Sequence, residues 1–191
     1  MNKPAGLFRN FLIVFLCGFL IAQSASFVQP EEAYALNSTS VIVKPAAGTY
    51  RVGDTFEVEI WIQDAADLYG ADVQLTFDPS NFEVIDANPG TTMVEITPRS
   101  DLLYPDLVVK KEADNSEGKV WYAAAQLNPR PPASGSGSIC SFTLKVLSGG
   151  QADIDVEYSK LSDKNGIEIP AEAFGSSYLL NWRFFLPLIL T

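Results

Sequence analysis

The 191-residue sequence contains no histidine and only two cysteines. Without imidazole side chains it cannot form a Ser-His-Asp triad, a Cys-His pair or a histidine metal ligand. Two thiols are also too few for a four-cysteine zinc site or an iron–sulfur cluster. Several classes of enzyme are therefore excluded, and we predict no catalytic residue, no metal site and no cofactor. A binding or structural module remains, beside an enzyme that works with carboxylates alone.

Basic residues are scarce as well. The chain has 13 Lys and Arg residues against 23 Asp and Glu residues, which gives a formal net charge of −10. Binding to nucleic acid depends on cationic side chains that displace phosphate counterions, and anionic membrane surfaces attract the same side chains. We therefore expect no nucleic-acid partner. The 47% of hydrophobic and 12% of aromatic residues indicate a folded domain and not a disordered acidic tail.

The apolar run near the N-terminus is short. Residues 11–22 (FLIVFLCGFLIA) are apolar or small, whereas a transmembrane helix needs about 20 such residues. Two basic residues precede the run and small residues follow it, as in a secretory signal peptide. Cleavage after Ser24 or after Ala35 fits the small residues, and the A-Y-A motif that ends at Ala35 favours the second site. We predict a signal peptide over residues 1–35 and a secreted chain without a transmembrane span.

Removal of residues 1–35 leaves 191 − 35 = 156 residues, with Cys140 as the only cysteine. No internal disulfide can then form, so a hydrophobic core must hold the fold. A chain of about 150 residues buries roughly 68–70% of its surface, which is enough for one domain. We assign this domain to residues 36–180. Residues 181–191 (NWRFFLPLILT) are expected to be a hydrophobic tail or a last edge strand, because Pro187 cannot donate to a sheet ladder.

Apolar and polar residues alternate along much of the chain after residue 40, which predicts β-strands. In residues 55–63 (TFEVEIWIQ), the Phe, Val and Ile side chains fall on one face and Trp61 falls on the other. Residues 152–158 (ADIDVEY) alternate in the same way and place Tyr158 inward. Further candidate strands are residues 40–44, 71–77, 82–86, 107–112, 119–127, 140–146 and 177–182.

Turn-forming residues separate these strands. Pairs such as Gly53-Asp54 and Asn165-Gly166 supply the backbone conformations that reverse a chain. Residues 129–137 (PRPPASGSG) are the most loop-like segment, and we expect a long loop there. About nine strands without a long helix predict an all-β fold, an antiparallel β-sandwich.

Several short motifs occur in an order and spacing that are typical of one family. They are V-G-D-T-F at residues 52–56, L-Y-G-A-D-V-Q-L-T-F-D-P at 68–79, F-E-V at 82–84, G-S-G at 135–137, I-C-S-F-T-L-K-V at 139–146 and L-S-D-K-N-G at 161–166. With these motifs the chain resembles the cohesin domains of cellulosome-type systems over roughly residues 41–180. The resemblance implies a jelly-roll sandwich of nine strands.

The resemblance also implies a function. One sheet face of cohesins binds dockerins, which are small calcium-loaded helical modules, and performs no catalysis. An acidic residue on the strand before the D-P turn helps to anchor the dockerin, and Asp72 holds this position here. Gly70 stands where the family often has an asparagine. We therefore expect a secreted or cell-surface module that binds a protein, with Asp72, Gln74 and Thr76 as its partner-binding residues.

A carbohydrate-binding module is the alternative, with a polysaccharide as its ligand. Trp61 is the one large aromatic residue on an otherwise polar strand face, and related sandwiches stack such rings on sugars. Glu57 and Glu59 lie on the same face, about 6.5–7 Å apart along the strand. We interpret them as ordinary strand carboxylates and not as a glycosidase pair. Trp121 and Tyr122 fall on opposite faces of their strand, so one of them points outward unless it is covered.

Overall fold

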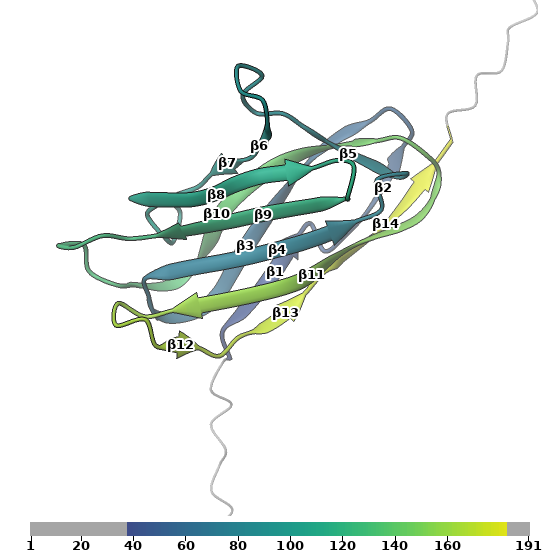
Figure 1. Cartoon of the computed structure of the whole chain (residues 1–191). Helices are drawn as coiled ribbons and strands as arrows, with labels where there is room; N and C mark the ends of the chain where they lie inside the picture. The colour runs from purple at the N-terminus through teal and green to yellow at the C-terminus, as the bar shows by residue number, and fades with distance from the viewer. Residues whose placement is uncertain (1–37, 183–191) are drawn as a thin grey trace, which may run out of the picture. The chain divides into compact units, whose positions relative to one another are not determined.

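A computed structural model describes residues 38–182 of the chain. Their alternating side chains fold this part into two β-sheets that lie face to face, here called sheet A and sheet B (Figure 1). The predicted signal peptide at residues 1–35 and the tail beyond residue 182 lie outside the described residues. Between residues 38 and 182 the structure has no helix that is long and apolar enough to cross a membrane.

Sheet A has six strands, and sheet B has eight. In spatial order, sheet A contains β13 (Glu172–Phe174), β1 (Ser40–Lys44), β3 (Thr55–Leu68), β10 (Ala133–Val146) and β5 (Phe82–Ile85), with β7 (Thr97–Pro98) also paired to β10. Sheet B contains β2 (Ala47–Arg51), β14 (Ser176–Asn181), β11 (Gly150–Ser162), β4 (Gly70–Phe77), β9 (Lys119–Ala125), β8 (Leu107–Asp114) and β6 (Val94–Glu95), with β12 (Glu168–Ile169) beside β11.

The predicted all-β sandwich is confirmed, although the sheets are mixed. Two strand pairs, β1 with β13 and β14 with β2, run parallel, and all the other pairs are antiparallel. The described residues form fourteen strands, more than the nine expected, and four of these have only two or three residues. Such short strands contain no alternation that a sequence pattern could reveal.

The core lies between the two sheets. Val58, Ile60 and Ile62 of β3 are fully buried, and so are Val73 and Leu75 of β4 in the facing sheet. Each such side chain contributes about 1.5–3 kcal/mol by leaving water. Apart from Trp61, the outer neighbours of these residues are polar, so the alternation seen in the sequence separates the core from the surface.

Aromatic rings fill one end of this core. The ring centroids of Tyr50 and Phe56 are 3.8 Å apart, and Tyr178 lies 5.1 Å from Phe56 and 5.9 Å from Phe82. Cys140 is fully buried, and burial raises the pKa of its thiol. It is the only cysteine of residues 38–182, so apolar packing holds this domain together without a disulfide.

The loop predicted at residues 129–137 is partly wrong, because β10 begins at Ala133. The opposite strand β3 continues to Leu68, and its irregular end is held by hydroxyl groups from the Gly-Ser segment. The N–H groups of Asp64 and Asp67 donate to the hydroxyls of Ser136 and Ser134, over 2.9 and 3.1 Å. Both aspartates have a positive φ, which aspartate tolerates better than most residues. Side-chain hydrogen bonds thus extend a strand pair that alternation does not predict.

The direction predicted for Tyr158 is also wrong. The pairing of β11 with β4 changes register between Val156 and Tyr158, which marks a β-bulge at Glu157. Because one extra residue reverses the alternation, Tyr158 lies opposite Gln74 on the outer side of sheet B and is 42% exposed. The sequence alternates without a break from Ala152 to Tyr158, so the pattern up to this residue does not reveal the bulge.

Two buried tyrosines differ in their hydrogen bonds, and this difference yields a prediction about stability. Tyr122 is fully buried, and its hydroxyl oxygen has no hydrogen-bond partner among the described residues. The hydroxyl of Tyr178 donates to the carbonyl oxygen of Pro45 over 2.9 Å. Burial without a partner is unfavourable for a polar group, whereas a formed hydrogen bond stabilises the folded state.

Tyr122→Phe is therefore expected to leave the free energy of unfolding unchanged or to raise it by up to about 1 kcal/mol. The matched variant Tyr178→Phe is expected to lower it by about 1 kcal/mol, because the bond to Pro45 is lost. Urea unfolding of both purified variants measures the difference. A larger loss of stability in Tyr122→Phe than in Tyr178→Phe would contradict this account of the core.

Candidate functional site

Four neighbouring strands of sheet B, β11, β4, β9 and β8, present one continuous outer face (Figure 1). Their registers align the outward side chains in three rows that run across the strands. The first row contains Lys160, Asp72, Ala123 and Lys110, the second Tyr158, Gln74, Trp121 and Glu112, and the third Asp155, Thr76, Lys119 and Asp114. These twelve residues define what we call the outer face of sheet B.

The predicted partner-binding residues Asp72, Gln74 and Thr76 all lie on this face. They occupy alternate positions of β4, are each half-buried, and follow one another along the middle of the face. Buried neighbours such as Val73 and Leu75 anchor them from below. The structure thus brings the three residues together, and their role in partner binding stays a prediction.

Trp121 of β9 lies at the centre of the outer face of sheet B. Its indole Nε1–H donates to Oδ1 of Asp72 over 2.7 Å. The Nζ atom of Lys110 lies 4.6 Å from the centroid of the Trp121 ring and 2.6 Å from Oε1 of Glu112. These contacts link β4, β9 and β8 through side chains, so Asp72 is held in a fixed orientation.

Sequence reasoning left the direction of Trp121 open and missed its contact with Asp72. The structure places Tyr122 in the core and Trp121 outside. A tryptophan next to a tyrosine gives no direction by itself, since both residue types occupy cores. The register between β4 and β9 is what places Trp121 opposite Gln74 and beside Asp72.

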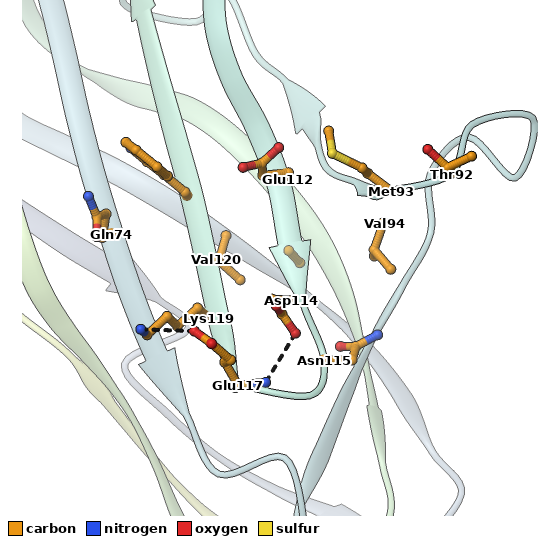
Figure 2. A pocket seen from close by; sticks show the side chains of 12 residues that line it. Gln74, Thr92, Met93, Val94, Glu112, Asp114, Asn115, Glu117, Lys119 and Val120 are labelled. Carbon is orange, nitrogen blue, oxygen red and sulfur yellow. Dashed lines mark hydrogen bonds and ion pairs between the residues drawn. The ribbon is translucent and has the colours of Figure 1, made fainter.

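A groove of about 530 Å³ adjoins this centre near the edge of sheet B. Figure 2 shows Gln74 on one side of it and Met93 with Thr92 on the other, with Glu112 and Asp114 between them. The loop before β6 contributes Met93, whose side chain is 54% exposed. The groove therefore has an apolar wall and a floor that carries carboxylates.

The charged groups at the lower end of the groove belong to the turn between β8 and β9. Oδ1 of Asp114 accepts hydrogen bonds from the hydroxyl and N–H of Ser116 and from the N–H of Glu117. The Ser116 hydroxyl is the main cause of a lowered pKa of Asp114, which stays ionised at neutral pH. Lys119 forms an ion pair with Glu117, at 3.1 Å. Asp114 thus adds a negative charge to this end of the groove, beside the paired charges of Lys119 and Glu117.

Trp61, the predicted sugar-stacking residue, lies on the other sheet. It belongs to β3, and the Nζ atom of Lys44 lies 3.6 Å from the centroid of its ring. On the same strand, Glu57 and Glu59 both accept from Arg99, at 3.2 and 3.5 Å. The structure therefore does not bring Trp61 together with Asp72, and a lysine ammonium covers the ring.

The turn at Asp163 is built by local hydrogen bonds. Oδ1 of Asp163 accepts from the N–H groups of Asn165 and Ile167, at 2.8 Å each. The Ile167 bond is the main cause of a lowered pKa of the Asp163 carboxyl. This agrees with the interpretation of the segment as a tight turn. Across residues 38–182 no group of three or more His, Cys, Asp or Glu side chains is arranged to hold a metal ion.

Comparison with known proteins identifies the family. The model of the cohesin domain matches residues 39–169. The chain belongs to the cohesin family. A cohesin domain is a protein-binding module without catalytic activity, and the twelve-residue outer face of sheet B is a surface that this module exposes. No curated protein matches the chain.

Solved cohesin structures share the fold at low sequence identity. A type II cohesin domain from the cellulosome of Acetivibrio cellulolyticus has a TM-score of 0.60 at 16% identity, covering 74% of this chain and 95% of its own. A type I cohesin–dockerin complex from Clostridium thermocellum has a TM-score of 0.60 at 14% identity, and the match covers 75% of this chain and 99% of that chain. A non-cellulosomal cohesin from the archaeon Archaeoglobus fulgidus has a TM-score of 0.54 at 14% identity, and the match covers 75% of this chain and 91% of that chain.

One end of the outer face is held by an ion pair between two loops. Asp106 directly precedes β8, and Arg130 follows β9. The guanidinium of Arg130 donates to both carboxylate oxygens of Asp106, at 2.7 and 2.9 Å, and lies 3.7 Å from the ring centroid of Tyr104. The N–H of Leu127 also donates to Asp106. Arg130 first, and Leu127 second, lower the pKa of Asp106 from 3.8 to about 2.

Since the pKa of Asp106 is lower in the folded state, its contacts stabilise the fold above about pH 4, and this contribution disappears as the pH falls through about 2. Asp106→Asn is therefore expected to lower the thermal midpoint at pH 7, and the difference from the wild type should vanish near pH 2. Thermal unfolding followed by circular dichroism between pH 2 and 7 tests this. Asp153→Asn, an exposed carboxylate of β11, is the control and should show no such pH-dependent difference.

Proposed function

We propose that this chain is a secreted cohesin module that binds a dockerin-like protein through the outer face of sheet B. The contact between Trp121 and Asp72 at the centre of this face is the observation that carries the proposal. It fixes a carboxylate and an aromatic ring on rigid strands before any partner arrives. Groups that are already ordered lose little conformational entropy on binding.

The composition of the face suits a protein partner. Trp121 and Tyr158 supply aromatic surface near its centre, and such residues carry much of the binding energy in protein interfaces. Ala123 beside them is small and only 9% exposed, so the surface at this point is formed by the larger side chains around it. Charges of both signs surround this centre and would set the orientation of the partner.

Asp72 has binding capacity left for a partner. Its Oδ1 atom accepts from Trp121, whereas a carboxylate has about four acceptor positions in total. A hydroxyl or amide of a dockerin helix can donate to the remaining positions. Trp121 thus acts as a positioning residue for Asp72, in place of the asparagine that the family often has where this chain has Gly70.

Secretion and the domain limits belong to the same proposal. A signal peptide over residues 1–35, a cohesin domain over residues 36–180 and a hydrophobic tail over residues 181–191 would deliver the module outside the cell. The family match over residues 39–169 falls inside the proposed domain. We further propose that the tail serves retention at the cell surface.

Carbohydrate binding at Trp61 stays a prediction that the arrangement of side chains does not favour. The face of β3 that carries Trp61 is occupied by ion pairs, and Lys44 lies over the ring. A sugar would first have to displace this ammonium group.

Ala123→Arg is expected to weaken dockerin binding at least about 100-fold, because a long charged side chain would fill the centre of the face. Thr143→Arg on the outer side of sheet A is the matched control and should bind as the wild type does. Isothermal titration against dockerins encoded in the same genome, with and without a calcium chelator, measures the effect. Equal dockerin binding by both variants would show that the binding site lies outside the outer face of sheet B. Retention on insoluble polysaccharide without any protein partner would overturn the proposal.

N-terminal sequencing of the protein recovered from the culture medium is expected to begin at Leu36, because signal peptidase prefers small residues such as those of the A-Y-A motif. A start at Ala25 would assign cleavage to the alternative site after Ser24. Retention of the full-length chain inside the cell would contradict secretion.

A further inference from the structure

The groove beside Trp121 lies away from the Asp72 row, and its chemistry is specific. Trp121 and Glu112 face each other across β9 and β8 in the second row of the outer face of sheet B, and Lys119 and Asp114 do so in the third. Met93, from the loop before β6, lies on the far side of the groove from Gln74 (Figure 2). The groove therefore joins a flat aromatic ring, a flexible thioether and two strand carboxylates.

The carboxylates outnumber the cations in this groove. Three acidic residues, Glu112, Asp114 and Glu117, line it together with one basic residue, Lys119. Lys119 is paired with Glu117, and Lys110 from outside the lining binds Oε1 of Glu112. Within residues 38–182, no hydrogen bond involves Oε2 of Glu112 or Oδ2 of Asp114. Two carboxylate oxygens are thus free to accept from a ligand.

The spacing of these acceptors defines the ligand. Glu112 and Asp114 are two residues apart on one strand face, which corresponds to about 6.5–7 Å. A planar guanidinium has five N–H donors and can reach two acceptors at once, whereas an ammonium is a point charge. Guanidinium groups also stack on aromatic faces, and the apolar arm of an arginine fits against a methionine side chain.

We propose that this groove binds an arginine side chain of the protein partner, next to an apolar residue of the same partner segment. The guanidinium lies between Glu112 and Asp114, and the apolar neighbour contacts Met93. This inference rests on the proposed function, because the groove continues the outer face of sheet B. It adds the chemistry by which a correct partner is distinguished from one that lacks the arginine.

The test uses two synthetic peptides, since the natural partner is unidentified. Both are acetylated, amidated, alanine-based helical peptides with one leucine beside the probe residue. The first peptide carries arginine, and the second carries citrulline, which keeps the planar shape but has no charge. The ¹⁵N-labelled protein is titrated with each peptide at low ionic strength, and the indole N–H signal of Trp121 and the amide signal of Met93 are followed by nuclear magnetic resonance.

The arginine peptide is expected to bind at least about tenfold more tightly than the citrulline peptide, as charge-assisted hydrogen bonds require. The preference should shrink as salt is added. Asp114→Asn keeps the Oδ1 acceptor that holds the β8–β9 turn but removes the charge. The ratio of the affinities for the arginine and citrulline peptides should therefore fall close to one. Asp153→Asn removes an exposed carboxylate of β11 outside the groove, and the preference should persist. Met93→Ala should weaken the binding of both peptides by the same factor.

Equal affinity for the two peptides, or signal changes confined to the Glu57 and Glu59 side of the molecule, would overturn the inference. The inference would also be overturned if cellohexaose shifts the signals of Trp121 and Met93 while the arginine peptide does not. That result would assign the groove to a sugar. If dockerin binding fails in Ala123→Arg but the wild type shows no arginine preference, only this inference falls. If no dockerin binds while the preference holds, the dockerin proposal is wrong, and the groove is assigned to an arginine of another protein partner.

Discussion

The apolar interface between sheets A and B is the interaction on which the rest of the structure depends. No disulfide supports it, because Cys140 is the only cysteine of the described residues. Side chains such as Ile60 and Leu75 are fully buried there, and their burial decides which neighbours point to solvent. The outer face of sheet B is thus a consequence of the core. Asp72 and Gln74 are outside because Val73 and Leu75 are inside.

Two β-bulges interrupt this alternation in the strands that carry the outer face of sheet B. One lies at Glu157 in β11, and the other lies between Val108 and Lys110 in β8. These strands flank the central pair β4 and β9 on either side. The first bulge turns Tyr158 outward, and the second brings Lys110 into register with Ala123. Both bulged strands therefore supply residues to the rows around Trp121, and bulges commonly redirect side chains at functional sites.

The sequence predicted much of the fold and part of the candidate site. Alternation identified β3 and β4 and put Asp72, Gln74 and Thr76 on one face, since period two is a local property. It failed for Tyr158 because the alternation continues from Ala152 to Tyr158 across the bulge at Glu157. It could not find the contact between Trp121 and Asp72, which are 49 residues apart and meet only through strand register. The groove at Met93 was missed for the same reason.

The isolation of Cys140 has a practical consequence. Its thiol lies between the sheets and is fully buried, and burial keeps it from forming the thiolate that reacts. Among residues 38–182, a cysteine introduced on the exterior of the domain would then be the single position that a maleimide dye can modify while the sandwich is closed. The native thiol itself would record how often the two sheets separate, because each modification requires an opening event. The modification rate of Cys140 thus reports the opening of the native domain without any mutation.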